Sequence, residues 1–265
     1  MIDKVIHYCW FGSNPKSDLI NRCIESWKKY CPDYQIIEWN ESNFDINMFE
    51  YTKQAYKEKK YAFVSDVARL YVVYNYGGIY LDTDIELKDS LDDFLDYDGW
   101  FNWESNLFIA TGLGFGAQKG NKFVKDMLED YKDKKFYKKN GSADLTPCPK
   151  INTLSLLKYN KMIKRDGTTQ VHDNVIFCNR ELYNPKLINH QAGSWIENKD
   201  ESLTDKVYKD KYIKRKLRDQ KLLDFLEKYM SNKLFDMYIF FSYDILENGI
   251  MYFLTRKINS IRRNK

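Results

Sequence analysis

The stretch YAFVSDVARLYVVYNYGGIYLDTDIEL, residues 61–87, decides the fold of this chain. In its first part Asp66 and Arg69 lie three residues apart, so they share one side of a predicted helix. Gly77 and Gly78 are expected to end that helix, because glycine adopts a left-handed C-cap conformation without steric cost. The helix itself is predicted from apolar residues that recur at the spacing of one helix face: Phe63, Val67, Leu70, Tyr71 and Tyr74.

Two aspartates follow the glycine pair, one residue apart, where apolar and polar residues alternate. This alternation predicts a strand that places Asp82 and Asp84 on one face, where two hard oxygen ligands can share a divalent cation. An isolated D-x-D pattern is more often a solvated strand end or a turn. Here a helix that carries Asp66 and Arg69 precedes the pair, and charges rarely gather beside so apolar a segment without pairing or function. The context favours a site.

Composition bounds the class of protein. With 265 residues, 43% of them hydrophobic, the chain can bury a full core in one domain with a small appendage. Aromatic residues make up 16% of the chain and suit stacking against nucleobases or sugars. No secretory signal is expected, because no N-terminal stretch has a basic region followed by an apolar run. No apolar run approaches the roughly 18 residues of a membrane span. The five cysteines form no C-x-x-C pair, which indicates reduced, mostly buried thiols in a cytosolic protein.

The first forty residues predict a strand, a helix and a second strand. The strand is KVIHYCW, residues 4–10; a helix capped by Ser17 extends to about Tyr30; and a second strand covers residues 34–39. A unit of this kind places a nucleotide-sized crevice at the carboxyl ends of its strands, and Trp10 ends the first strand.

The middle of the chain has weaker signals. Residues 41–60 suggest a loop and a polar helix, and an aromatic strand closes residues 91–103. The glycine-containing segment LFIATGLGFGAQ, residues 107–118, lacks the G-K-[ST] of a phosphate loop, and we interpret it as a close-packed loop on the substrate side. Beyond it the pattern predicts helices at about 121–131 and 152–159 and a late strand at 171–178.

The late segment NHQAGSW, residues 189–195, places His190, Ser194 and Trp195 on a predicted loop. The other two histidines, His7 and His172, lie in strand-like runs and are expected to be structural.

From residue 206 onward the composition changes. Residues 206–265 hold fifteen Lys and Arg against seven Asp and Glu, so the rest of the chain is acidic. We therefore predict a domain at 1–205 and a basic, amphipathic helical tail at 206–265. The tail suits an anionic membrane interface, and it equally suits a helical pair packed on the core. No nucleic-acid motif is present, and no nucleic-acid partner is expected.

Together the block at 61–87, IHYCWFG near the start and HQAGSW late resemble the glycosyltransferases with a DXD-containing sugar-binding region. That family includes bacterial capsular and exopolysaccharide sugar transferases, fungal initiating mannosyltransferases and, more distantly, the clostridial glucosylating toxins. The opening is most similar to the bacterial branch, and the resemblance covers about residues 1–196. It implies an α/β protein of the GT-A fold, a Rossmann-like mixed sheet flanked by helices, and a metal-dependent transfer that retains anomeric configuration.

The resemblance also implies roles for residues that would hold the donor. Trp10 matches the residue that stacks on the nucleobase, and Asp66 and Arg69 match residues that hold the hydroxyls of the donor sugar. Tyr80 matches a positioning tyrosine. Asp82 matches the aspartate that contacts ribose and sugar. Residues that grip the β-phosphate are matched by Ser194 and Trp195.

The metal would be held by Asp84 directly, by His190, and by Asp82 directly or through water. Carboxylates with one imidazole suit Mn²⁺ better than Ca²⁺, so Mn²⁺ is the expected cofactor, with Mg²⁺ as the alternative. The expected donor is UDP-galactose or UDP-glucose. The expected acceptor is a glycan, such as a lipid-linked capsular or exopolysaccharide repeat unit, and the expected location is the cytoplasm or the inner face of the membrane.

Two other functions fit parts of the sequence. LDTDI matches the nucleophile motif of haloacid-dehalogenase-type phosphatases, but that motif belongs near the N-terminus and here follows a complete strand–helix–strand unit. The chain could also be a non-catalytic nucleotide-sugar or membrane-binding module of a polysaccharide assembly. Against this second function stands the intact set Asp66, Arg69, Asp82, Asp84 and His190.

Overall fold

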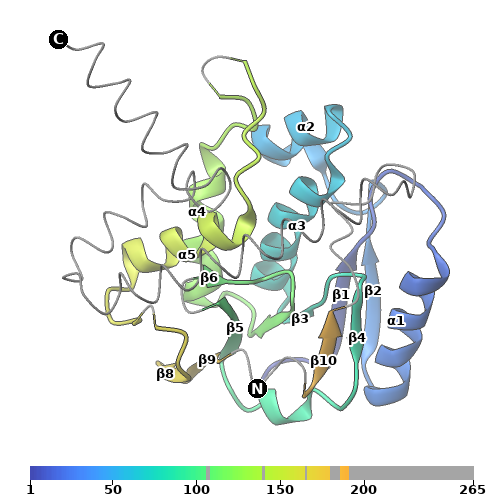
Figure 1. Ribbon diagram of the computed structural model, residues 1–265, viewed down its shortest axis with the longest axis vertical. Helices are drawn as coiled ribbons and strands as arrows, with labels where there is room; N and C mark the ends of the chain where they lie inside the picture. The colour runs from blue at the N-terminus through green and yellow to red at the C-terminus, as the bar shows by residue number, and fades with distance from the viewer. Residues whose placement is uncertain (106–107, 139–140, 165, 180–185, 191–265) are drawn as a thin grey trace, which may run out of the picture. The chain divides into compact units, whose positions relative to one another are not determined.

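The computed structural model describes residues 1–190 except 106–107, 139–140, 165 and 180–185 (Figure 1). Its centre is an eight-stranded mixed sheet in the order β2-β1-β3-β7-β5-β9-β8, with β6 paired to β5 beside this path. The strands are β1 (Val5–Cys9), β2 (Gln35–Trp39), β3 (Gly78–Tyr80), β5 (Gly99–Ser105), β6 (Phe108–Ile109), β7 (Phe115–Ala117), β8 (Gln170–His172) and β9 (Val175–Cys178). A separate antiparallel pair consists of β4 (Ile85–Leu87) and β10 (Ile188–His190).

Strand β1 lies between β2 and β3 and is parallel to both. The chain reaches β2 through α1 (Asp18–Tyr30) and then crosses to the other side of β1 through α2 (Glu50–Lys57) and α3 (Tyr61–Tyr76). Connections that leave one strand in opposite directions create a crevice at the carboxyl ends, where open α/β sheets bind ligands. The segments that follow β1 and β3 carry Trp10 and the two aspartates, so the topology directs them to this crevice.

Helices cover both faces of the sheet. One face packs against α2, α3, α4 (Lys122–Lys132) and α5 (Cys148–Tyr159), with Tyr80 and Phe101 in its core. The other face packs against α1 and a short helix at Asp92–Phe94. The predicted α/β architecture, a Rossmann-like sheet flanked by helices as in the GT-A fold, is therefore confirmed, although the sheet contains more antiparallel pairs than parallel ones.

Helix α1 begins where the sequence predicted. The Ser17 hydroxyl accepts a hydrogen bond from the backbone N–H of Ile20, as an N-cap does. One turn before the helix ends, the fully buried Trp27 donates its indole N–H to the carbonyl of Ile85 at 2.6 Å. This bond ties α1 to β4 and so fixes the chain directly after Asp84.

Helix α3 ends at Tyr76, also as predicted. Gly77 and Gly78 follow with φ angles of 73° and 89°, which favour glycine. A Cβ on Gly78 would lie 2.8 Å from the carbonyl oxygen of Val5, so the turn also needs glycine for space. Only Gly77 therefore separates the end of α3 from the start of β3.

His7 supports that connection from β1. Its Nδ1 accepts a hydrogen bond from the Trp39 indole at 3.1 Å, so its Nε2 carries the proton and donates to the carbonyl of Gly77 at 2.9 Å. Burial lowers the pKa of His7, which keeps the ring neutral. The predicted structural role of His7 is confirmed.

The predicted strand through the D-x-D motif is wrong. Strand β3 ends at Tyr80, and a turn containing Asp82 and Asp84 separates it from β4. The N–H of Ile85 bonds to the carbonyl of Asp82, and the N–H of Asp82 bonds to the carbonyl of Gly112. The two aspartates therefore do not share a strand face, because the chain leaves the main sheet between them.

Other segments differ in detail. The predicted loop at 107–118 contains β6 and β7, and the predicted late strand at 171–178 is a hairpin whose turn has Asp173 and Asn174 at positive φ. Helix α5 begins at Cys148, four residues before the predicted start. All five cysteines are free and buried, as predicted.

Residues 191–265 lie outside the described part of the chain, and with them the predicted domain boundary, Ser194, Trp195 and the basic tail. Among the helices that the structure does describe, none combines the length and the apolar character needed to cross a bilayer.

Candidate active site

Four of the sequence-predicted residues form one contact network after β3. Arg69 on α3 places Nη2 3.0 Å from Oδ1 of Asp82 and 3.2 Å from Oδ1 of Asp66. The hydroxyl of Tyr80 donates to the same Oδ1 of Asp82 at 2.8 Å, and the Arg69 guanidinium lies 5.0 Å from the centre of the Tyr80 ring. One oxygen of Asp82 thus receives two donors from two different elements.

The network is largely removed from solvent. Only 4% of the Arg69 side chain is exposed, whereas 31% of the Asp82 side chain remains accessible. Burial would lower the pKa of Arg69, but Asp82 and the surrounding acidic groups hold it above its ordinary value. Burial raises the pKa of Asp66, and Arg69 opposes that rise. A buried guanidinium therefore holds two carboxylates together, and one of them faces solvent.

Asp84 has a different partner. Its Oδ2 lies 3.3 Å from Nε2 of His190, because the antiparallel pairing of β4 and β10 sets His190 opposite Ile85. The Asp84 side chain is 8% exposed and the His190 side chain 38%. The hydrogen bond to Asp84 raises the pKa of His190, and Glu104 at the end of β5 acts in the same direction.

The donor set can be tested against a divalent cation. Burial raises the pKa of Asp82 to about 6, with Arg69 opposing this and the charge of Asp84 adding to it. Arg69 is paired with Asp66 and Asp82, and Asp84 adds a third carboxylate beside them, an excess of negative charge that a cation would neutralise. Within the described residues no group of three His, Cys, Asp or Glu is placed to hold an ion by itself. Mg²⁺-type ions are commonly bound by one or two protein groups and completed by substrate phosphates. The pair Asp84 and His190 fits such a site.

Trp10 directly follows β1, and its side chain contacts Asn14 and Lys16. Its indole donates to the carbonyl of Asn14 at 2.7 Å, and the ammonium of Lys16 lies 5.5 Å from its ring. Lys16 is itself held by Glu38 at 2.7 Å. The structure thus places Trp10 at the predicted edge of the sheet, in a side-chain network separate from that of Asp82.

Two participants were missed by sequence reasoning. Cys148 at the start of α5 accepts a hydrogen bond from Nη1 of Arg69 at 3.4 Å. Gly112 lies against the Asp82 carboxylate and also binds its backbone N–H. The interpretation of residues 107–118 as a substrate-side segment was the signal for Gly112. No local pattern marks Cys148, because its position depends on how α5 packs against α3.

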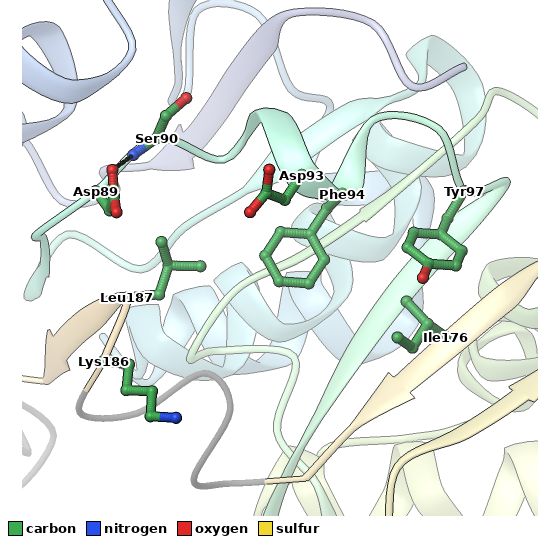
Figure 2. A pocket seen from close by; sticks show the side chains of 8 residues that line it. All are labelled: Asp89, Ser90, Asp93, Phe94, Tyr97, Ile176, Lys186 and Leu187. Atoms are coloured by element: carbon green, nitrogen blue, oxygen red, sulfur yellow. Dashed lines mark hydrogen bonds between the residues drawn. The ribbon is translucent and has the colours of Figure 1, made fainter.

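A pocket of about 330 Å³ lies away from these residues (Figure 2). Phe94 and Tyr97 line it from the segment before β5, Ile176 from β9, and Lys186 from the segment before β10. None of the candidate site residues that the structure describes lines it. It opens beside the residues that precede β5, at the opposite end of that strand from Glu104.

The sequence was compared with known protein families. Residues 17–100 match the family described as "Glycosyltransferase sugar-binding region containing DXD motif". This part of the chain is similar to that glycosyltransferase family. The matched region begins at the cap of α1 and includes Asp66, Arg69, Asp82 and Asp84.

The chain is also similar to individual proteins. Inositol phosphoceramide mannosyltransferase 3 of Schizosaccharomyces pombe is 29% identical over 144 residues, which are 49% of this chain and 37% of that protein. The match therefore spans well under half the length of this curated relative. The solved structure of PaToxG glycosyltransferase is 22% identical over 60% of this chain and 70% of that chain, with a TM-score of 0.44.

Proposed function

We propose that this glycosyltransferase moves a hexose from a nucleotide-sugar donor, preferably UDP-galactose or UDP-glucose, onto a glycan acceptor, in a metal-dependent reaction that retains anomeric configuration. The observation that carries the proposal is the Asp66–Arg69–Asp82 network directly beside the Asp84–His190 pair. One network offers hydrogen bonds to a sugar, and the other offers ligands to a cation. Both lie at the switch point of the sheet, where a nucleotide is expected.

In this proposal the donor lies across the carboxyl ends of β1 and β3. Trp10 stacks on the nucleobase, since an indole provides a broad apolar face. Asp66 and Arg69 hold the sugar hydroxyls. Asp82 is held by hydrogen bonds from Arg69 and Tyr80, and its exposed side contacts the ribose and the sugar. Ser194 and Trp195, which lie outside the described residues, would grip the β-phosphate.

Asp84 and His190 would hold Mn²⁺ or Mg²⁺, with Asp82 contributing directly or through water. When bound, the cation offsets the negative charge that develops on the departing diphosphate. His190 can serve only as a neutral imidazole, so the proton that it shares with Asp84 must leave before a cation binds. The diphosphate of the donor would supply the remaining ligands of the cation, and this would position the donor sugar beside Asp66 and Arg69.

No side chain is assigned as the catalytic base. A retaining transfer without a protein nucleophile proceeds on one face of the sugar, where the departing phosphate can accept the proton of the acceptor hydroxyl. The contribution of this chain would then be orientation of the donor and exclusion of water, which favours transfer over hydrolysis.

We further propose that the acceptor is a lipid-linked capsular or exopolysaccharide repeat unit, met at the inner face of the membrane. The mannosyltransferase relative acts, by its name, on a lipid, inositol phosphoceramide, which supports a lipid-linked acceptor. The basic composition of residues 206–265 supports attraction to anionic lipid. Deleting residues 231–265 should abolish flotation with phosphatidylserine-containing vesicles while preserving donor cleavage. Unchanged flotation would refute the membrane role.

Metal-dependent donor cleavage is the direct test of the activity. The full-length protein with Mn²⁺ is expected to release nucleotide from one donor among UDP-glucose, UDP-galactose and their N-acetyl forms, with nucleotide-activated mannose included because of the relative's name. EDTA should stop the release, and added Mn²⁺ should restore it, because the Asp84–His190 pair alone cannot neutralise a diphosphate. Calorimetry of nucleotide binding with and without Mn²⁺ completes the test.

The alternatives give different results. Metal-dependent nucleotide binding without cleavage, even when glycan acceptors are supplied, would indicate a non-catalytic binding module. An absence of both cleavage and metal-dependent binding would overturn the donor site itself.

A further inference from the structure

The two oxygens of the Asp82 carboxylate have different surroundings. Among the described residues, its hydrogen bonds from Arg69 and Tyr80 both end on Oδ1. The other oxygen, Oδ2, lies against Gly112 so closely that a Cβ on Gly112 would be 2.4 Å from it. The same Cβ would be 3.1 Å from Nη1 of Arg69. Gly112 therefore borders the side of the carboxylate that its two protein donors leave open.

The backbone of Gly112 does not require glycine. Its φ angle lies outside the left-handed region that disfavours other residues, unlike the φ angles of Gly114 and Gly120 farther along the chain. Gly120 gives the opposite case, because its φ is 76° and a Cβ there would meet nothing within 4 Å. Glycine is thus needed at 120 for conformation and at 112 for space.

Gly112 also holds Asp82 through the main chain. Its carbonyl accepts the N–H of Asp82 at 3.3 Å, which fixes the turn that separates Asp82 from Asp84. The backbone of the aspartate cannot retreat from residue 112 without losing this bond. A side chain at 112 must therefore displace the carboxylate itself, and with it the contact between Oδ1 and Arg69.

We propose that Gly112 is a positioning residue of the donor site: the missing side chain lets Asp82 bind Arg69 and Tyr80 through one oxygen while Oδ2 stays available to the donor sugar, ribose or metal-bound water. This role rests on the proposed function. Gly112 lies in the segment between β6 and β7, outside the region of the family match at 17–100.

A double-mutant cycle tests the geometry without reference to activity. Gly112→Ala is expected to lower Tm by about 5 °C in the full-length protein. In an Asp82→Ala background, which lacks the clashing oxygen, the same change should lower Tm by less than about 1 °C. In an Asp82→Asn background, which keeps an atom at that position, Gly112→Ala should remain as harmful as in the native protein.

Equal losses of Tm in all three backgrounds would overturn the contact with Asp82. Asp82→Ser, which also lacks the second oxygen, replaces Asp82→Ala if that variant does not fold. Gly120→Ala is the matched control: its strained φ should lower Tm without any dependence on residue 82.

Calorimetric titration with the nucleotide of the cleaved donor, in the presence of Mn²⁺, tests the functional part. At a temperature where all variants are folded, Gly112→Ala is expected to raise Kd at least about tenfold, whereas Gly120→Ala should leave it unchanged. Native affinity in Gly112→Ala would overturn the positioning role. If the native protein itself fails to bind nucleotide with Mn²⁺, the proposed function fails, while the stability cycle still decides the geometry of Gly112.

Discussion

Replacing Arg69 with methionine is expected to destabilise the protein by about 3 to 5 kcal/mol. Methionine fills much of the same volume, so the loss comes from the charge. Arg69 is 4% exposed and supplies the cation shared by Asp66 and Asp82. Without it the buried Asp66 and the partly exposed Asp82 remain close together with no positive partner. Removing one member of a buried ion pair is far more harmful than never having the pair. Denaturant unfolding of the two proteins measures the difference.

An exposed ion pair provides the matched control. Lys132 contacts Glu129 at 2.8 Å on the surface of α4, and both side chains are well exposed. Lys132→Met should therefore change stability by no more than about 0.5 kcal/mol. A similar small value for Arg69→Met would show that the buried network adds nothing to folding.

The pH dependence of the stability of the Arg69→Met variant shows whether the lost charge causes the destabilisation. Arg69 opposes the rise in the pKa of Asp66 that burial produces. Its removal should raise that pKa further above the unfolded value, so the folded state holds a proton over a wider pH range. Stability then falls as pH rises through this range, and the penalty is complete above the folded pKa. The variant should accordingly lose less stability relative to the native protein at pH 5 than at pH 8, whereas an equal loss at both values would indicate a packing defect.

Replacing Asp84 with asparagine is expected to reduce metal-dependent donor cleavage by about 100-fold or more. Asparagine keeps the shape of the side chain but removes the charge, and a weakened ligand set binds a divalent cation far less tightly. Because the described contact of the Asp84 carboxylate is with the partly exposed His190, folding should be affected much less than by the loss of Arg69. Initial rates over a range of Mn²⁺ concentrations separate a loss of metal affinity from a loss of turnover.

An exposed aspartate away from the candidate site serves as the control. Asp93→Asn removes one negative charge from the short helix before β5 and should leave the rate and the Mn²⁺ requirement unchanged. If Asp84→Asn retained the native Mn²⁺ dependence, Asp84 would not be a metal ligand, and the pair with His190 would be structural.

Much of the fold could be predicted because its signals are local. Ser17 marks the start of α1 through its own hydrogen bond, and the glycine pair at 77 and 78 marks the end of α3 through its φ angles. The pairing of Asp66 with Arg69 followed from helical spacing alone. Each of these features depends on residues within a few positions of one another.

The arrangement of the D-x-D motif could not be predicted in the same way. Alternation of apolar and polar residues continues through the motif, yet the N–H of Asp82 bonds to Gly112, thirty residues away, and Ile85 enters a second sheet. The hairpin of β8 and β9 was likewise merged into one strand, because Asp173 and Asn174 carry polar side chains that a strand edge also tolerates. At the D-x-D motif a tertiary hydrogen bond overrode a local pattern, whereas in the hairpin a two-residue turn at positive φ interrupted it.

The two halves of the candidate site also differ in how far apart their partners lie along the chain. Arg69 and Asp82 are separated by 13 positions, whereas positions 84 and 190 are separated by 106. By loop-closure entropy alone, bringing the distant pair together costs about 2 kcal/mol more. His190 lies on a strand of three residues that pairs with another of three. Fraying of β10 would therefore remove the imidazole from Asp84 while the ion pair between Arg69 and Asp82 stayed assembled. The half proposed to bind the sugar can thus outlast the half proposed to bind the cation.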